Sequence, residues 1–253
     1  MRAPRSIVIT GASSGIGEEL ALAYAAPGVA LALSGRDPAR LGAVVERCRS
    51  LGAEVDGAVL DAADRDAMAG WLAAVDQRSP VDLVIANAGI SAGTGGGMES
   101  EEQARRIFQV NLDGVLNTVH PLLPAMQARR RGQIALMASL AGFRGMPGAP
   151  AYCASKAAVR VYGESLRGDL AGHGVGVSVI CPGFVKSRMT AVNCFPMPFL
   201  MEADRAAKVI QRGLARNKAR ISFPWPMAAA VWLLAALPAG WTDALLRQAP
   251  RKE

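Results

Sequence analysis

Short apolar runs alternate with helical patterns along most of the chain. The runs are rich in Val, Ile, Leu and Ala, and a stretch of helical periodicity follows almost every one. Helices placed in this way cover both faces of a parallel sheet, so that its strands are buried on both sides. We therefore expect an α/β fold with a Rossmann-type, doubly wound parallel sheet of about seven strands. The expected strands are 7–10, 29–33, 54–60, 81–86, 134–138, 175–181 and 220–223, and the expected helices are 18–26, 38–51, 64–75, 100–128, 151–171 and 203–217.

The composition agrees with one folded domain. The chain has 253 residues, of which 51% are hydrophobic and 19% are charged, which excludes a disordered chain. We expect a single domain over 1–223, followed by an apolar C-terminal extension over 224–253. The four cysteines show no C-x-x-C spacing and the chain has two histidines, so we predict reduced thiols and no metal site. An apolar strand begins at Ile7, which leaves no room for a signal peptide and predicts a cytoplasmic protein.

The formal net charge of +7 raises the question of a nucleic-acid partner. The chain has neither a recognition motif nor a stripe of basic and aromatic residues, so we predict no such partner. Three arginines, 129–131, stand at the end of an expected helix. Cations in that position complement the helix dipole, so we interpret them as structural.

Residues 10–17 have the sequence T-G-A-S-S-G-I-G and join the first expected strand to the first helix. Glycines allow the tight turn and the close approach of a ligand to the backbone. The amides at the start of the following helix favour a pyrophosphate. This segment therefore predicts a dinucleotide cofactor.

The end of the second strand indicates which dinucleotide. A carboxylate there would bind the ribose hydroxyls and repel a 2′-phosphate, but the sequence is Ser34-Gly35-Arg36. An arginine guanidinium binds phosphate well. We predict NADP(H), with Ser14, Ser34 and Arg36 as phosphate contacts.

Tyr152 and Lys156 are four residues apart in an expected helix, so their side chains lie on one face. A free tyrosine has a pKa near ~10, and a nearby cation lowers it. The pair is thus a candidate for acid/base chemistry. Ser139 follows the fifth expected strand, at the edge where such sheets bind ligands.

Together these motifs resemble the short-chain dehydrogenase/reductase family, in its small single-domain branch. The resemblance extends from about Ser6 to Phe223, with the motifs in the family's order. Ser187 stands where the family usually has threonine, which keeps the hydroxyl and loses a methyl group. The cofactor contacts that the resemblance implies, with the phosphate contacts above, are Gly11, Ser13, Ser14, Gly15, Ile16, Gly17, Ser34, Arg36, Asp61, Ala62, Asn87, Ala88, Gly89, Tyr152, Lys156, Pro182, Gly183, Val185 and Ser187.

The resemblance also implies a mechanism, a hydride transfer between NADP(H) and a carbonyl or alcohol. In it Tyr152 is the general acid/base and Lys156 lowers the tyrosine pKa and binds the nicotinamide ribose. Ser139 orients and polarises the carbonyl, and Asn111 holds a water that links Lys156 to solvent. The alternative is a non-catalytic NADP-binding regulator or scaffold, against which the complete set of four residues argues. The family suggests a homodimer or homotetramer built on the helices expected at 100–128 and 151–171.

Three loops, 91–98, 140–150 and 184–201, are expected to shape the substrate pocket. Residues 194–201 are apolar and uncharged, which favours a lipophilic substrate or a loop that packs on a neighbour.

The C-terminal segment carries no charged residue between Arg220 and Asp243. Its unbroken apolar run over 227–237 is shorter than the ~20 residues that span a bilayer. Three roles remain open. Residues 224–246 form a membrane-surface helix, with Trp225, Trp232 and Trp241 at the interface, or they cover the pocket, or they form a dimer contact. Three cations follow the tryptophans and fit the membrane role: Arg247, Arg251 and Lys252.

Overall fold

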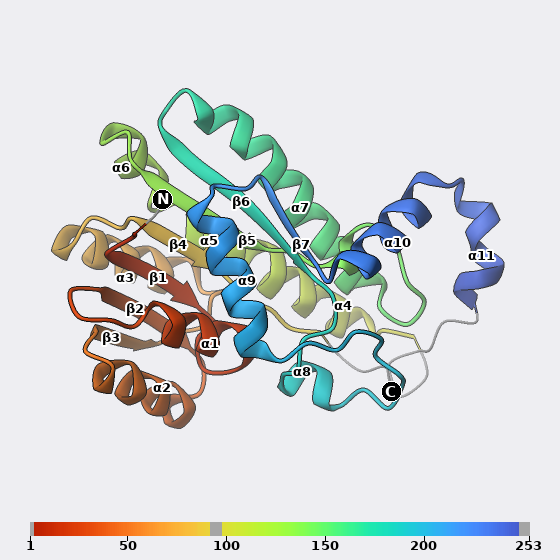
Figure 1. Cartoon of the computed structure of the whole chain (residues 1–253), viewed down its shortest axis with the longest axis horizontal. Coiled ribbons are helices and arrows are strands. Elements are labelled where there is room, and N and C mark those ends of the chain that lie inside the picture. The colour runs from red at the N-terminus through yellow and green to blue at the C-terminus, as the bar shows by residue number, and fades with distance from the viewer. Residues whose placement is uncertain (1–2, 92–97, 248–253) are drawn as a thin grey trace.

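Seven parallel strands form one sheet in the order β3-β2-β1-β4-β5-β6-β7 (Figure 1). We describe a computed structural model over residues 3–91 and 98–247. The predicted Rossmann-type sheet is confirmed. The strands are β1 (Ser6–Thr10), β2 (Ala30–Gly35), β3 (Glu54–Val59), β4 (Leu83–Ala86), β5 (Gly132–Met137), β6 (Val175–Pro182) and β7 (Arg220–Phe223). The α-helices are α1 (Gly15–Tyr24), α2 (Pro38–Ser50), α3 (Arg65–Arg78), α4 (Glu101–Phe108), α5 (Gly114–Val119), α6 (Leu123–Ala128), α7 (Pro150–Ala171), α8 (Arg188–Ala191), α9 (Ala203–Ala215), α10 (Trp225–Ala236) and α11 (Ala239–Arg247).

Successive residues of each strand pack on opposite faces of the sheet. In β1, Ile7 and Ile9 join the core beneath α1, α2 and α9, whereas Val8 joins the core beneath α3, α5 and α7. Because both faces are covered, the central strands are apolar throughout, which produces the continuous apolar runs seen in the sequence.

β1 and β4 are neighbours at the centre of the sheet, with Ile7 opposite Leu83 and Ile9 opposite Ile85. The chain leaves these two strands for opposite sides of the sheet order, to β2 and to β5. A crevice forms beyond the carboxyl ends of strands at such a switch point. The glycine-rich loop after β1 and the Asn87 segment after β4 meet there.

The prediction of one helix over 100–128 is wrong. The segment is divided into α4, a π-turn at η1 (Gln109–Asp113), α5 and α6. Pro121 has no backbone N–H to continue the helix beyond α5, and Pro124 lies at the start of α6, where proline is well tolerated.

The arginines that follow α6 make tertiary contacts. The Arg129 guanidinium pairs with Asp76 at 2.8 Å and that of Arg131 with Asp82 at 2.8 Å. Arg130 donates a 3.0 Å hydrogen bond to the carbonyl oxygen of Gly172. These contacts join the end of α6 to α3, to the loop before β4 and to the loop after α7, which agrees with a structural role.

The C-terminal segment forms two helices, α10 and α11, that lie at the end of the molecule beyond β7 (Figure 1). Arg251 and Lys252 lie outside the described residues, as does the side chain of Arg247. Every helix in the described part of the chain is too short or too polar to cross a membrane.

Candidate active site

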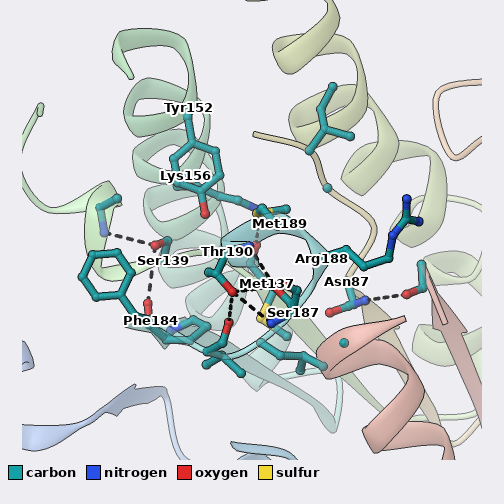
Figure 2. A pocket seen from close by; sticks show the side chains of 18 of the residues that line it. Asn87, Met137, Ser139, Tyr152, Lys156, Phe184, Ser187, Arg188, Met189 and Thr190 are labelled. Atoms are coloured by element: carbon teal, nitrogen blue, oxygen red, sulfur yellow. Dashed lines mark hydrogen bonds between the residues drawn. The ribbon is translucent and has the colours of Figure 1, made fainter. Parts of the chain in front are cut away.

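A cavity of about 630 Å³ lies beyond the carboxyl ends of the central strands. With one exception, every residue that the sequence analysis assigns to cofactor binding or catalysis lines it; the exception is Asn111. Figure 2 shows Ser139, Tyr152 and Lys156 on one side of the cavity and Asn87 on the other. Of the three loops expected to shape the pocket, 140–150 and 184–201 contribute to its wall, and residues 92–97 of the third lie outside the described residues.

The glycine-rich loop is shaped by its contacts with the segment after β4. Gly11 has φ +66°, and a Cβ added there would lie 2.8 Å from the Cα of Ala88. A Cβ on Gly17 would collide with the carbonyl oxygen of Gly11 and the Asn87 amide. The first helix begins at Gly15, three residues earlier than predicted. Its first amides therefore border the cavity, and the Ser14 side chain does not cap them.

Asn87 holds this loop in place. Its Nδ2 donates to the carbonyl oxygens of Thr10 at 2.9 Å and Gly11 at 3.2 Å. The Thr10 hydroxyl in turn accepts hydrogen bonds from the amides of Asn87 and Ala88, each at 3.1 Å. Asn87 and Ala88, which follow β4, thus stabilise the loop that would hold a pyrophosphate.

At the end of β2, the side chain of Arg36 is exposed and lines the cavity. Within the described residues, no hydrogen bond or ion pair holds its guanidinium. Ser34 lines the same end but is 2% exposed, so the arginine is the more open of the two.

Asp61 borders this end of the cavity and is held by two partners. Its carboxylate accepts a 3.0 Å hydrogen bond from the Ala63 amide and pairs with Arg106 of α4. Burial acts to raise the pKa of Asp61, but the Ala63 amide and the Arg106 guanidinium outweigh it, so the pKa lies below its ordinary value. The charge of Arg36 acts in the same direction. A fixed, ionised carboxylate therefore stands beside Arg36.

Ser139 follows β5 and begins the 3₁₀ turn η2 (Leu140–Gly142). Its hydroxyl accepts a 3.1 Å hydrogen bond from the Ala141 amide and donates a 3.4 Å bond to the carbonyl oxygen of Pro182. It also acts on Tyr152, in the first turn of α7, because it favours the ionised form of the phenol. The two hydroxyl groups therefore lie side by side on the cavity wall.

The effect of Lys156 on the pKa of Tyr152 stays a prediction, and other groups account for the shift seen in this structure. Burial raises the pKa of Tyr152 above its ordinary value, and the nearby Ser139 hydroxyl only partly offsets that. Lys156 points elsewhere, because its ammonium donates a 2.8 Å hydrogen bond to the carbonyl oxygen of Met137. Its Nζ lies 5.9 Å from the centre of the Tyr152 ring. Burial also lowers the pKa of Lys156 to about 8.

Asn111 is fully buried in the π-turn, behind the cavity wall. Its side chain exchanges hydrogen bonds with the backbone of Ile90, at 2.7 and 2.9 Å, and donates to the Ser155 hydroxyl at 3.1 Å. A Cβ on Gly89 would lie 3.2 Å from Asn111 Oδ1 and 3.3 Å from Lys156 Nζ, so the two groups converge there. Asn111 thus ties the segment after β4 to α7, and its role toward water stays a prediction.

The segment after β6 crosses over the glycine-rich loop. A Cβ on Gly15 would lie 3.1 Å from the Cβ of Ser187. The Ser187 hydroxyl caps α8 by accepting a 3.4 Å hydrogen bond from the Thr190 amide. Val185 pairs with Met201 in a parallel bridge, which closes the loop over 184–201 on itself.

Helix α10 forms a wall of the cavity, through Met227, Val231 and Leu234. A Cβ on Gly183 would lie 2.7 Å from the sulfur of Met227, so the helix packs directly on the Pro182-Gly183 turn. One face of α10 therefore covers the pocket, which is one of the three roles left open for the C-terminal segment. The long apolar run was the available signal, but it did not say which face turns inward.

Arg144 connects the 140–150 loop to this segment. Its guanidinium donates to the Ala239 carbonyl oxygen at 3.3 Å and to the Thr242 hydroxyl at 3.1 Å, and it pairs with Asp243 at 3.2 Å. Arg144 also lines the cavity, within the 140–150 loop that was expected to shape it. The expected loops also supply Met146, Phe184, Arg188, Thr190 and Phe195, whereas the lining residues Asp37 and Arg40 were not predicted.

The family profile described as short chain dehydrogenase matches residues 5–194 of this chain. The chain belongs to the short-chain dehydrogenase family. An uncharacterized oxidoreductase of Myxococcus xanthus is 42% identical over 245 residues, which are 96% of this chain and 97% of that protein. These findings make the chain an oxidoreductase of this family.

Two solved structures are similar to this one. A short-chain dehydrogenase from Sphingobium yanoikuyae in complex with NADPH is 25% identical and has a TM-score of 0.77. The match covers 98% of this chain and 97% of that one. A 3-oxoacyl-[acyl-carrier protein] reductase with bound NAD from Brucella melitensis is 26% identical and has a TM-score of 0.74. This match covers 86% and 87%. The fold thus binds a nicotinamide dinucleotide in both of these proteins. One holds NADPH, which carries a 2′-phosphate, and the other holds NAD, which lacks it.

Proposed function

We propose that this short-chain dehydrogenase is an NADP(H)-dependent oxidoreductase that interconverts a lipophilic carbonyl compound and its alcohol. The observation that supports this best is that Ser139, Tyr152 and Lys156 share one cavity with the glycine-rich loop. A reductase needs both parts in one cavity, because the loop would hold the cofactor and the hydroxyls would act on the carbonyl.

The residues present fit a dinucleotide. Gly11 and Gly17 leave a cradle that a Cβ would fill, and the uncapped start of α1 offers amides to a pyrophosphate. The nicotinamide ring supplies or accepts the hydride when it is bound. Pro182, Gly183 and Ser187 border the end of the cavity where the ring would lie.

The protein's own groups handle the proton. In reduction, the Ser139 and Tyr152 hydroxyls donate hydrogen bonds to the carbonyl oxygen and stabilise the charge that develops on it. The phenol of Tyr152 then gives up its proton to that oxygen. The phenol is protonated at neutral pH, as an ordinary tyrosine is, and this is the form that can donate. The ammonium form of Lys156 stabilises the phenolate that is left behind.

The preference for NADP(H) rests on Arg36. A guanidinium beside the adenosine ribose binds a 2′-phosphate with charge-assisted hydrogen bonds. Its side chain is exposed at the cavity and has no hydrogen bond or ion pair among the described residues. The nearby Asp61 carboxylate is engaged by Arg106, which leaves Arg36 available.

The apolar character of the cavity supports a lipophilic substrate. Its lining includes Phe184 and Phe195 from the 184–201 loop and Met227 and Val231 from α10. Such a lining favours a substrate with an apolar body next to its reactive oxygen.

We also propose the assembly and setting that the sequence suggests. Phe108 of α4 and Val161 of α7 are exposed apolar residues on the helices expected to form a homodimer or homotetramer. The reductase domain would comprise 1–223. The protein would be cytoplasmic, with a peripheral membrane contact through 224–246.

A panel of ketones and aldehydes, assayed with NADPH and with NADH, tests the function. We expect nicotinamide absorbance to fall with NADPH and lipophilic ketones, and more slowly with NADH. The absence of turnover with every carbonyl and alcohol in the panel, with both cofactors, would overturn the proposal.

A further inference from the structure

Large apolar side chains are exposed around the substrate end of the cavity, the part lined by Phe184, Phe195 and α10. Phe199 and Leu200 extend from the 184–201 loop, and Trp225, Trp232, Leu233 and Trp241 extend from the C-terminal helices. Trp225 is 78% exposed and Trp241 is 77% exposed. We call these six residues the apolar rim. Exposed apolar patches of this kind mark a surface that binds something.

The rim is continuous with the lining of the cavity. Along α10, Val231 and Leu234 face the cavity, while Trp232 and Leu233 between them are exposed. In the 184–201 loop, Pro198 lines the cavity and the adjoining Phe199 is exposed. Rim residues therefore adjoin lining residues both on α10 and in the 184–201 loop.

The charge pattern favours a lipid surface as the occupant of the rim. No charged residue occurs between Arg220 and Asp243, whereas the chain as a whole carries a net charge of +7. An uncharged, tryptophan-bearing face on a cationic protein complements an anionic bilayer, where tryptophan favours the interface. α10 has 12 residues, so it measures roughly 18 Å, too short for the ~30 Å hydrocarbon core, and can lie only along the surface.

A second copy of the chain fits the rim less well. Because the rim residues alternate with residues that line the cavity, a protein seated on them would cover its substrate end. A fluid bilayer can cover the same face and still supply a lipophilic molecule.

We propose that the apolar rim docks on an anionic bilayer and that the substrate is a bilayer-dissolved carbonyl compound, which enters the cavity past α10. The carbonyl's apolar body would leave the lipid for the cavity lining, and its oxygen would reach Ser139 and Tyr152. This inference rests on the proposed reductase function and adds the source of its substrate.

Flotation of the full chain with vesicles tests the docking. The vesicles contain phosphatidylcholine alone or with phosphatidylglycerol, and the variant is Trp232→Ser with Trp241→Ser, neither of which lines the cavity. We expect the wild type to float with the anionic vesicles. The affinity of the variant for the same vesicles should be lower by roughly tenfold or more. The control, Leu51→Ser with Val59→Ser, changes two exposed apolar residues at the α2–β3 end of the sheet, far from α10 (Figure 1). It should bind as the wild type does.

Turnover separates the docking from the catalysis. The double tryptophan variant should reduce a small water-soluble ketone at the wild-type rate and a vesicle-held long-chain ketone roughly tenfold more slowly. If the wild type reduces ketones but does not float with anionic vesicles, the docking is wrong and the reductase function stands. If sedimentation shows that the tryptophan variant is a smaller oligomer, and vesicles bind neither protein, the rim is an interface between copies. If the protein floats but reduces no carbonyl, the proposed function fails instead.

Discussion

The ammonium group of Lys156 donates a 2.8 Å hydrogen bond to the carbonyl oxygen of Met137, at the end of β5. The bond anchors a buried cation to the strand edge, one turn of α7 beyond Tyr152. Lys156 is thus held close to the phenol but not directed at it, with its Nζ 5.9 Å from the ring centre. The chain uses the rigid sheet edge to place a charge that the chemistry requires.

This arrangement predicts the alkaline limb of the pH profile. Burial lowers the pKa of Lys156 to about 8, so the ammonium is charged below that pH and neutral above it. Because the charged form stabilises the phenolate, kcat/KM for ketone reduction should fall as the pH rises through about 8. Lys156→Arg keeps its charge to a higher pH and should move that limb upward, even if its kcat is lower. Identical limbs in the two proteins would assign the ionisation to another group.

Arg36 should determine the choice of cofactor. Arg36→Asp replaces the phosphate partner with a carboxylate that binds ribose hydroxyls and repels a 2′-phosphate. We expect the ratio of kcat/KM for NADPH over NADH to fall by roughly tenfold to a hundredfold. Arg216→Asp makes the same charge change on an exposed residue after α9 that does not line the cavity, and it should leave the ratio unchanged. Equal effects of the two substitutions would mean that net charge alone acts.

Gly17 should tolerate no side chain. Its Cβ would collide with the Gly11 carbonyl oxygen and the Asn87 amide, so Gly17→Ala must displace the glycine-rich loop. We expect it to abolish detectable cofactor binding by calorimetry and to lower the free energy of unfolding by roughly 1–3 kcal/mol. Gly42→Ala in α2 meets nothing within 4 Å and should instead stabilise the protein by roughly 0.5–1 kcal/mol. Normal cofactor binding by Gly17→Ala would refute the steric argument.

Arg144 should hold the C-terminal helices against the substrate loop. Arg144→Ala removes its bonds to Ala239, Thr242 and Asp243. Because these bonds are partly exposed, we expect a loss of roughly 1 kcal/mol in the free energy of unfolding. KM for a bulky ketone should rise by roughly threefold to tenfold as α10 loses its support. Arg144→Lys can keep the Asp243 pair, so its KM and its free energy of unfolding should lie between those of the wild type and those of Arg144→Ala. An unchanged KM in Arg144→Ala would show that α10 is held by packing alone.

The sequence predicted the parts of this molecule that depend on local chemistry. The apolar runs become buried strands because both sheet faces are covered, and Gly11 to Gly17 form a turn that other residues could not make. The predicted site residues from Asn87 to Ser187 lie after successive strands. The order of the strands then brings them to the same edge of the sheet.

Tertiary packing determines what the sequence did not predict. Pro121 divides a segment whose periodicity is otherwise helical. The bond between Lys156 and Met137 joins a helix to a strand edge, which the spacing of Tyr152 and Lys156 cannot show. α10 is apolar on all sides, so no pattern in it distinguishes the face that lines the cavity from the exposed one.

The measurement that tests the central claim most directly is ketone reduction by Tyr152→Phe, with NADPH binding measured on the same protein. The substitution removes only the phenolic hydroxyl, from a side chain that lines the cavity together with Ser139. We predict that kcat falls by roughly a hundredfold or more while the NADPH dissociation constant changes less than about threefold. Full activity in Tyr152→Phe would contradict the assignment of Tyr152 as the proton donor, and with it the proposed mechanism.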